Sequence, residues 1–107
     1  MADYIYLPDL QKQAQTPAKG ILSQTVQEGQ GTKTVLFGFA AGQELSPHAA
    51  PYPALITILK GEASLLLGED WKDAAEGSFA WMPPNLQHGL KAKTEVVMLL
   101  TMVKGGA

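Results

Sequence analysis

Two stretches of the sequence indicate its fold: GQELSPHAAPYPALITILKG (Gly42–Gly61) and GSFAWMPPNLQH (Gly77–His88). Each stretch begins with a glycine and contains one histidine, and His48 and His88 are the only two histidines in the 107 residues. Imidazole both binds metal ions and transfers protons near neutral pH. The two histidines are therefore the first candidates for a functional site.

The two stretches resemble the signature motifs of the cupin superfamily, G-x5-H-x-H-x3-E-x6-G and G-x5-P-x-G-x2-H-x3-N. The positions that agree with the motifs are Gly42, His48, Gly61, Gly77, Pro83 and His88. Four positions depart from them: Ala50 replaces the second His, Ala54 the Glu, Asn85 a Gly and Ala92 the final Asn. The resemblance extends from Val35 to Val103. It implies an all-β double-stranded β-helix, or jelly-roll barrel, with the motif histidines facing one internal ligand site.

The pattern of short apolar runs also predicts an all-β fold. Clusters of Gly, Pro, Asn and Asp separate these runs and can supply the backbone dihedrals of turns. Many short strands with frequent turns are typical of a β-sandwich or barrel. We expect strands at 21–26, 33–40, 54–60, 63–67, 78–82, 87–91 and 94–103. Gly61, between two of these strands, is expected to close a tight hairpin with a positive φ.

The length of the chain predicts a single domain over residues 1–107, which the resemblance implies is a cupin domain. Residues 1–20 are expected to form an N-terminal arm or leading strand. Within it, the segment Gln11–Ala18 is expected to be extended rather than helical, because it is polar and contains Pro17. The arm could pack across the barrel or onto a neighbouring subunit, and the alternative is a loosely ordered terminus.

Composition restricts the partners. All eight basic residues are Lys and the net charge is −2, which argues against nucleic acid as a partner. The longest apolar run, Val96–Leu100, is too short to cross a bilayer. Met1–Tyr4 lack the start of a secretory signal, so we expect no membrane association and a cytoplasmic location. Because only 17% of the residues are charged, we also expect a homodimer.

The resemblance implies a metal site, but only His48 and His88 remain of its ligands. Ala50 and Ala54 carry no donor atoms, and two imidazoles alone bind weakly because zinc sites usually take three or four protein ligands. The implied cofactor is one divalent transition metal (Zn, Ni, Fe or Mn), completed by waters, by a third donor or by a substrate. The alternative is a polar pocket without metal. The nearest polar candidates are Glu44, which would share the face of His48 on an unbroken strand, Tyr52, and Gln87, which should face away.

Three further residues are candidate ligand contacts. Trp81 and Met82 stand at a strand end just before Pro83-Pro84, where binding sites often lie. Tyr52 stands between two prolines at the expected rim, where it could gate the pocket or, as we favour, cap the core. Phe79, Met98 and Met102 could line the cavity and contact an apolar ligand, but we favour ordinary core positions for them.

These observations predict a small cupin-fold protein that binds a small molecule, with or without a weakly held divalent metal. The alternative is a metal-dependent enzyme of dioxygenase or isomerase type. The loss of ligands at Ala50 and Ala54 counts against a dioxygenase, because oxygen activation uses iron held by a full facial triad. A third hypothesis is an interaction domain with a vestigial pocket.

Overall fold

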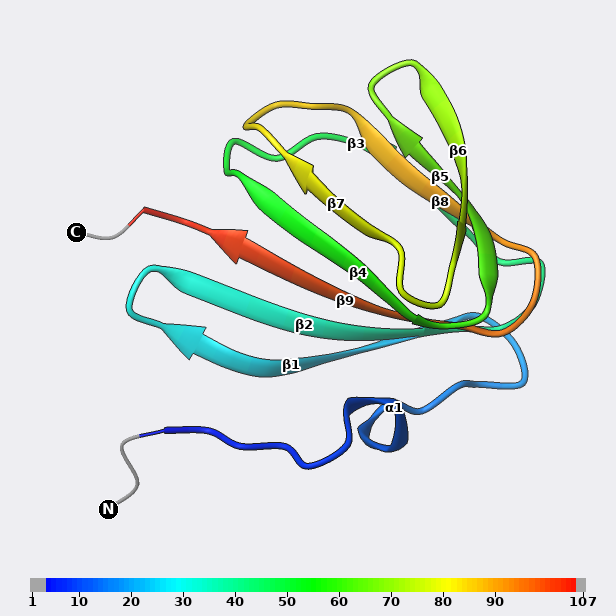
Figure 1. Ribbon diagram of the computed structural model, residues 1–107, viewed down its shortest axis with the longest axis horizontal. Helices are drawn as coiled ribbons and strands as arrows, with labels where there is room; N and C mark the ends of the chain where they lie inside the picture. The colour runs from blue at the N-terminus through cyan, green and yellow to red at the C-terminus, as the bar shows by residue number, and fades with distance from the viewer. Residues whose placement is uncertain (1–3, 106–107) are drawn as a thin grey trace.

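Two antiparallel sheets form a barrel in the computed structural model of the protein, which describes residues 4–105 (Figure 1). In chain order the elements are α1 (Leu10–Gln13), β1 (Ile21–Gly29), β2 (Thr32–Phe39), β3 (Glu44–His48), β4 (Ala54–Lys60), β5 (Glu62–Leu67), β6 (Asp70–Ala75), β7 (Phe79–Met82), β8 (His88–Ala92) and β9 (Val96–Val103). The five-stranded sheet has the order β1-β2-β9-β4-β7, and the four-stranded sheet has the order β3-β8-β5-β6. The fold is the predicted double-stranded β-helix.

The core lies between the two sheets and follows from the two-residue period of the strands. In β4, Ala54, Ile56 and Ile58 face inward and are at most 4% exposed. Leu65 and Leu90 face them from the four-stranded sheet and belong to the same cluster. Burying a large aliphatic side chain stabilises the fold by about 1.5–3 kcal/mol, so these alternating positions hold the two sheets together.

All seven predicted strands are present, and β4 has the predicted bounds. The structure adds β3 and β6, whose side chains are mostly exposed and which therefore lack an apolar pattern. The prediction for Gln11–Ala18 was wrong at its start. Leu10–Gln13 form one helical turn because the side chain of Asp9 accepts a hydrogen bond from the Lys12 backbone N–H, which caps the helix.

The hairpin prediction is confirmed at Gly61, where φ is +92°. The core prediction is confirmed for Met98, which is 1% exposed, whereas Met102 is partly buried against the core. The core prediction is wrong for Phe79, which is 61% exposed. Its neighbour Ala80 faces the core, and alternation along β7 then directs Phe79 outward.

The N-terminal arm lies on the outer face of the five-stranded sheet. Residues 1–3 of the predicted arm are outside the described residues, while residues from Ile5 to Gln15 line crevices that they share with β1, β2 and β9. The side-chain amide of Gln11 donates a hydrogen bond to the carbonyl of Leu59. A Cβ on Gly38 would overlap the Gln15 carbonyl, so this glycine allows the arm to lie directly on β2.

No helix within residues 4–105 is both long and apolar enough to cross a membrane.

Candidate functional site

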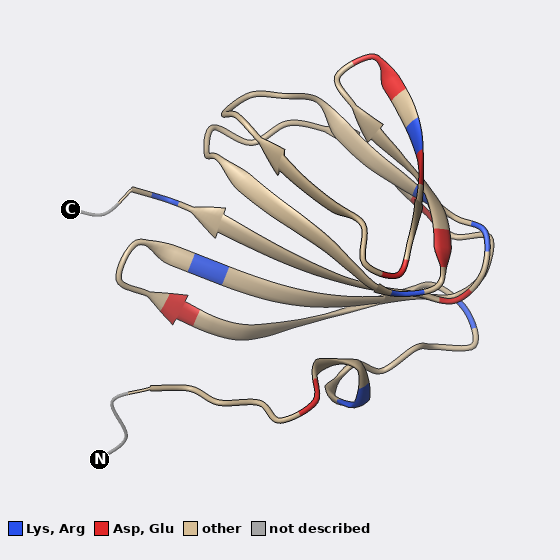
Figure 2. Ribbon diagram, viewed as in Figure 1, with Lys and Arg blue, Asp and Glu red and all other residues tan. Residues whose placement is uncertain are grey.

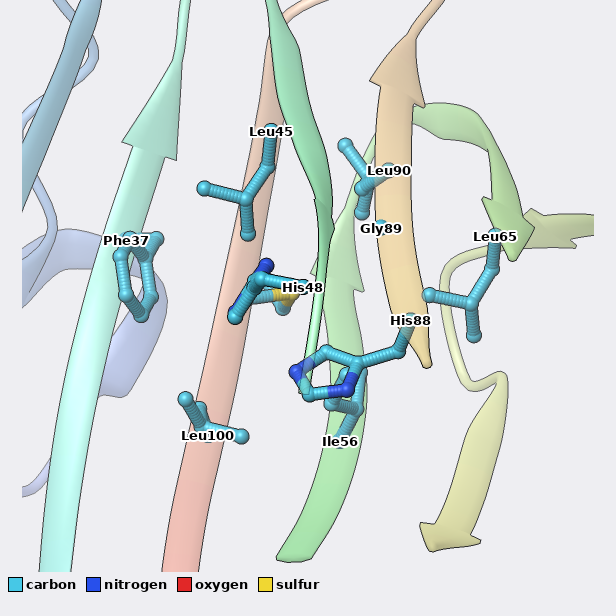
Figure 3. Close-up of a pocket in the computed structure, with 10 residues that line it drawn as sticks. Phe37, Leu45, His48, Ile56, Leu65, His88, Gly89, Leu90 and Leu100 are labelled. Atoms are coloured by element: carbon cyan, nitrogen blue, oxygen red, sulfur yellow. The ribbon is translucent and has the colours of Figure 1, made fainter. Parts of the chain in front are cut away.

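His48 and His88 meet across the four-stranded sheet at one end of the barrel. His48 ends β3 and His88 begins β8, and their Cα atoms are partners in the antiparallel ladder. The two ring centroids lie 4.3 Å apart and the ring planes are tilted by 58°. Both rings lie beside the same cavity (Figure 3). The structure thus brings together the two predicted metal ligands from positions 40 residues apart in sequence.

Both imidazoles are held in the same way by their own chain. The Nδ1 atom of His48 lies 2.8 Å from the Ser46 carbonyl oxygen, and that of His88 lies 3.0 Å from the Leu86 carbonyl oxygen. A carbonyl oxygen can only accept a hydrogen bond, so each Nδ1 carries the proton and donates it. In the neutral imidazole, Nε2 then has a lone pair and no proton. The pair therefore offers acceptor atoms.

Apart from this pair the cavity is apolar. Its volume is about 70 Å³, and its lining is made of Phe37, Leu45, His48, Ile56, Leu65, His88, Gly89, Leu90, Met98 and Leu100. None of these residues is Lys, Asp or Glu, so no fixed charge lines the cavity. His88 is buried and His48 is exposed, which places the open side of the cavity at His48.

Gly89 brings the two strands of the site close together. A Cβ at this position would lie 2.9 Å from the Leu45 carbonyl oxygen and 3.3 Å from the backbone of Pro47. Real Cβ atoms do not approach a backbone atom so closely, because repulsion rises steeply below the van der Waals distance. Glycine thus permits the approach of β3 to β8 that sets the two imidazoles side by side.

The environment of His88 favours its neutral form. Burial lowers the pKa of His88 below 6.5, and the nearby His48 lowers it further, while the hydrogen bond to the Leu86 carbonyl acts in the opposite direction. Desolvation disfavours the charged imidazolium. At neutral pH, His88 consequently keeps its Nε2 lone pair.

Glu44, one of the other polar candidates, does not share the face of His48. The ladder between β3 and β8 is irregular between Leu45 and His48, which breaks the alternation that would have placed Glu44 on the face of His48. Glu44 is exposed and opposes Lys91. Within the described residues no group of three or more His, Cys, Asp or Glu side chains could hold a metal ion.

The predicted ligand contacts do not line this cavity. Trp81 is 59% exposed and faces outward, while Met82 is 1% exposed and belongs to the core cluster. Tyr52 is partly buried after β3, with the Lys104 ammonium 5.7 Å from its ring centroid. Leu90, which was not among the residues predicted from the sequence, does line the cavity. It follows His88 by two positions, so the period of the strand could have identified it.

The two imidazoles are suitable metal ligands in kind, but they are fewer than the protein ligands that a metal site usually has. A hydrogen bond from Nδ1 to a carbonyl is the arrangement that orients metal-binding histidines. His48 and His88 would hold the ion through Nε2, and a bound ion would supply Lewis acidity to a ligand in the cavity. Two imidazoles fall short of the three protein ligands of an ordinary catalytic zinc site.

Comparisons with known proteins agree with the fold. The family model for the cupin domain matches residues 35–104. A conserved protein of unknown function from Streptococcus pyogenes is 30% identical, with a TM-score of 0.86, over 99% of this chain and 93% of its own. A cupin superfamily protein from Desulfitobacterium hafniense is 21% identical, with a TM-score of 0.84, over 98% and 95% of the two chains. The search of curated proteins gives no significant match.

Proposed function

Because this chain belongs to the cupin superfamily, we propose that its barrel cavity binds a small, uncharged and largely apolar molecule that donates a hydrogen bond to the His48–His88 pair. The observation that carries the proposal is the orientation of the two imidazoles. Each Nδ1 proton is used by a backbone carbonyl, so the pair presents acceptors to a cavity with otherwise apolar walls.

This chemistry selects a class of ligand. A hydroxyl group satisfies an imidazole lone pair, whereas an ether or ester oxygen leaves it unpaired, and an unpaired buried polar group costs about 1–3 kcal/mol. A carboxylate or phosphate would bring a charge into a cavity without a Lys or Arg side chain, where desolvation is costly. Alcohols and phenols are therefore favoured over their ethers and over anions.

The size of the cavity limits how much of the ligand is enclosed. Its volume of about 70 Å³ is roughly half of the ~150 Å³ that accommodates benzene in an engineered apolar cavity. The enclosed part is then a short group near His88, and a larger ligand extends past the exposed His48 toward solvent. Tyr52 remains a proposed contact for such an extension, whereas Trp81 faces outward and Met82 is buried in the core.

A matched series of small probes tests this proposal. Phenol, anisole and benzoate each contain one benzene ring. Phenol adds a hydrogen-bond donor, anisole only an acceptor and benzoate a negative charge. Binding is measured by chemical-shift perturbation in ¹H–¹⁵N spectra of the full chain. We expect phenol to bind more tightly than anisole by about tenfold, a loss of ~1.4 kcal/mol, and benzoate to bind least. The His88→Ala variant should lose this preference. Equal binding of all three probes would contradict the proposed chemistry.

We also infer that the same two Nε2 atoms hold a divalent transition metal (Zn, Ni, Fe or Mn) weakly, with the other positions open to water or ligand. The Nδ1 hydrogen bonds favour this second role. Metal content by plasma mass spectrometry, after incubation with each ion, should fall to background in His48→Ala and in His88→Ala. Stoichiometric metal retained by both variants would refute the two-histidine site. A dioxygenase or isomerase activity would need its third donor from the substrate.

A further inference from the structure

The five-stranded sheet contributes a sulfur donor to the cavity of the two histidines. Met98 lies on β9, is 1% exposed and lines the cavity together with His48 and His88. The histidines belong to the four-stranded sheet, so donors from both sheets border one space of about 70 Å³. A methionine side chain has three rotatable bonds and adapts to irregular spaces. Its thioether can therefore turn toward an ion that the two Nε2 atoms hold.

The sulfur atom changes which metal the site prefers. A thioether is a soft, uncharged ligand that selects Cu(I), whereas imidazole accepts zinc, copper, iron and nickel alike. The chain has no cysteine, so a thioether is the soft donor that it can offer. Two imidazoles and one thioether make three neutral ligands, a set that suits Cu(I) better than the hard divalent ions.

The charge around the cavity favours a monovalent ion. Among the described residues that line the cavity, none is Asp or Glu. The strands β7 and β9 carry no charged residue, and β4 carries only Lys60, at its end. Figure 2 shows the acidic residues in turns, at strand ends and on β6. The cost of moving an ion from water into a medium of low dielectric constant rises with the square of its charge, so an uncompensated divalent ion costs about four times as much as a monovalent ion of equal size.

The two alanines that depart from the first motif have the same effect. Ala54 replaces a glutamate, and it is 4% exposed and faces the core. A carboxylate at this position would bring a compensating negative charge into the barrel, and a histidine at Ala50 would bring a further nitrogen ligand. Their absence removes the groups that hold a divalent ion and leaves a neutral ligand set.

We propose that His48, His88 and Met98 together bind one Cu(I) ion through the two Nε2 atoms and Sδ, in preference to a divalent metal. This inference rests on the proposed metal role of the His48–His88 pair, to which it adds a third protein ligand and a choice of metal. Binding requires no electron transfer, because copper enters the site as Cu(I) and stays Cu(I).

Matched methionine variants test the role of the thioether. Competition with the chromophoric chelator bathocuproine disulfonate, without oxygen, measures the Kd for Cu(I), and calorimetry measures the Kd for zinc. Leucine nearly preserves the volume of methionine, so Met98→Leu removes the sulfur atom and keeps the core filled. Met82→Leu is the control, because Met82 is also 1% exposed but is not among the lining residues.

We expect Met98→Leu to raise the Kd for Cu(I) at least about tenfold, since even the loss of an outer-shell partner costs a metal site that much. The Kd for zinc in Met98→Leu, and both constants in Met82→Leu, should stay within about threefold of the wild type. X-ray absorption at the copper edge should show a copper–sulfur shell in the wild type that disappears in Met98→Leu.

Three results would overturn the proposal and leave the two-histidine site standing. They are zinc bound at least as tightly as Cu(I) by the wild type, an unchanged Cu(I) affinity in Met98→Leu, and a Cu(I) complex without a sulfur shell. A wild-type protein that binds neither metal would refute the two-histidine site as well.

Discussion

Gly61 provides a quantitative test of the turn that closes the first motif. Its φ is +92°, and Gly77, which opens the second motif, has nearly the same φ of +93°. The two positions differ in their surroundings. A Cβ at Gly61 would overlap the Glu95 carbonyl, whereas a Cβ at Gly77 would meet nothing within 4 Å. Alanine at Gly77 therefore reports the backbone strain alone, and alanine at Gly61 reports the strain plus the overlap.

The magnitudes follow from the contacts. A positive φ costs an L-residue about 1–2 kcal/mol. To accommodate a methyl group at Gly61, the loop before β9 must move by on the order of 1 Å. That loop is tied to Glu62, whose carbonyl accepts from the N–H groups of Lys93 and Thr94 at 2.9 and 3.3 Å. Losing both hydrogen bonds costs about 2 kcal/mol, so we expect about 3–4 kcal/mol for Gly61→Ala and about 1–2 for Gly77→Ala.

Urea denaturation followed by circular dichroism measures both variants against the wild type. The predicted difference of about 2 kcal/mol corresponds to a melting temperature roughly 8 °C lower for Gly61→Ala than for Gly77→Ala, at about 4 °C per kcal/mol. Equal free energies of unfolding for the two variants would show that the close approach of Glu95 does not constrain Gly61. A neutral Gly61→Ala would also refute the role of its positive φ.

Three further predictions concern the site and the arm. The free energy of unfolding should increase with pH below neutrality. The pKa of His88 is lowered from 6.5 in the folded protein, so the unfolded chain binds more protons than the folded chain as the pH falls below 6.5. Stability is therefore lost until the pH passes the folded-state pKa. Urea midpoints at pH 7.5 and 5.5 should therefore differ less in His88→Gln than in the wild type, and an unchanged difference would contradict this origin. Gly89→Ala should separate β3 from β8 and weaken zinc binding, measured by calorimetry, at least about tenfold, whereas unaltered affinity would show that the strand approach does not position His48. Gly38→Ala should displace the arm near Gln15, so that amide hydrogen exchange of residues 5–16 accelerates while the barrel stays protected; unchanged exchange would show that the arm does not rest on β2.

The strands that cross the core could be predicted from the sequence because each buries one face. The strand β4 shows this most clearly, since alternate residues Ala54, Ile56 and Ile58 are buried. The strands β3 and β6 could not, because their side chains are mostly exposed and their pairing depends on neighbours distant in sequence. Tertiary context of this kind commonly overrides local preference.

The sequence could single out the two histidines as candidates, but it could not predict the directions of the Trp81 and Glu44 side chains. Fixed spacing within two motifs identified His48 and His88, and the fold then placed them together. The direction of Trp81 depends on which set of alternate residues in β7 faces the core. A shift by one residue reverses the direction of every side chain in the strand. The face of Glu44 depends on the irregular pairing of β3 with β8, which no pattern in the sequence reveals.

The most direct test of the proposed site is long-range ¹H–¹⁵N NMR of the imidazole rings, with and without phenol. The chain has only two histidines, so the spectrum reports His48 and His88 alone. We expect protonated Nδ1 and unprotonated Nε2 in both rings at neutral pH, and phenol should shift the Nε2 signals while the Nδ1 signals stay nearly constant. Protonated Nε2 in both rings, or Nε2 signals that do not respond to saturating phenol, would contradict the proposed acceptor pair.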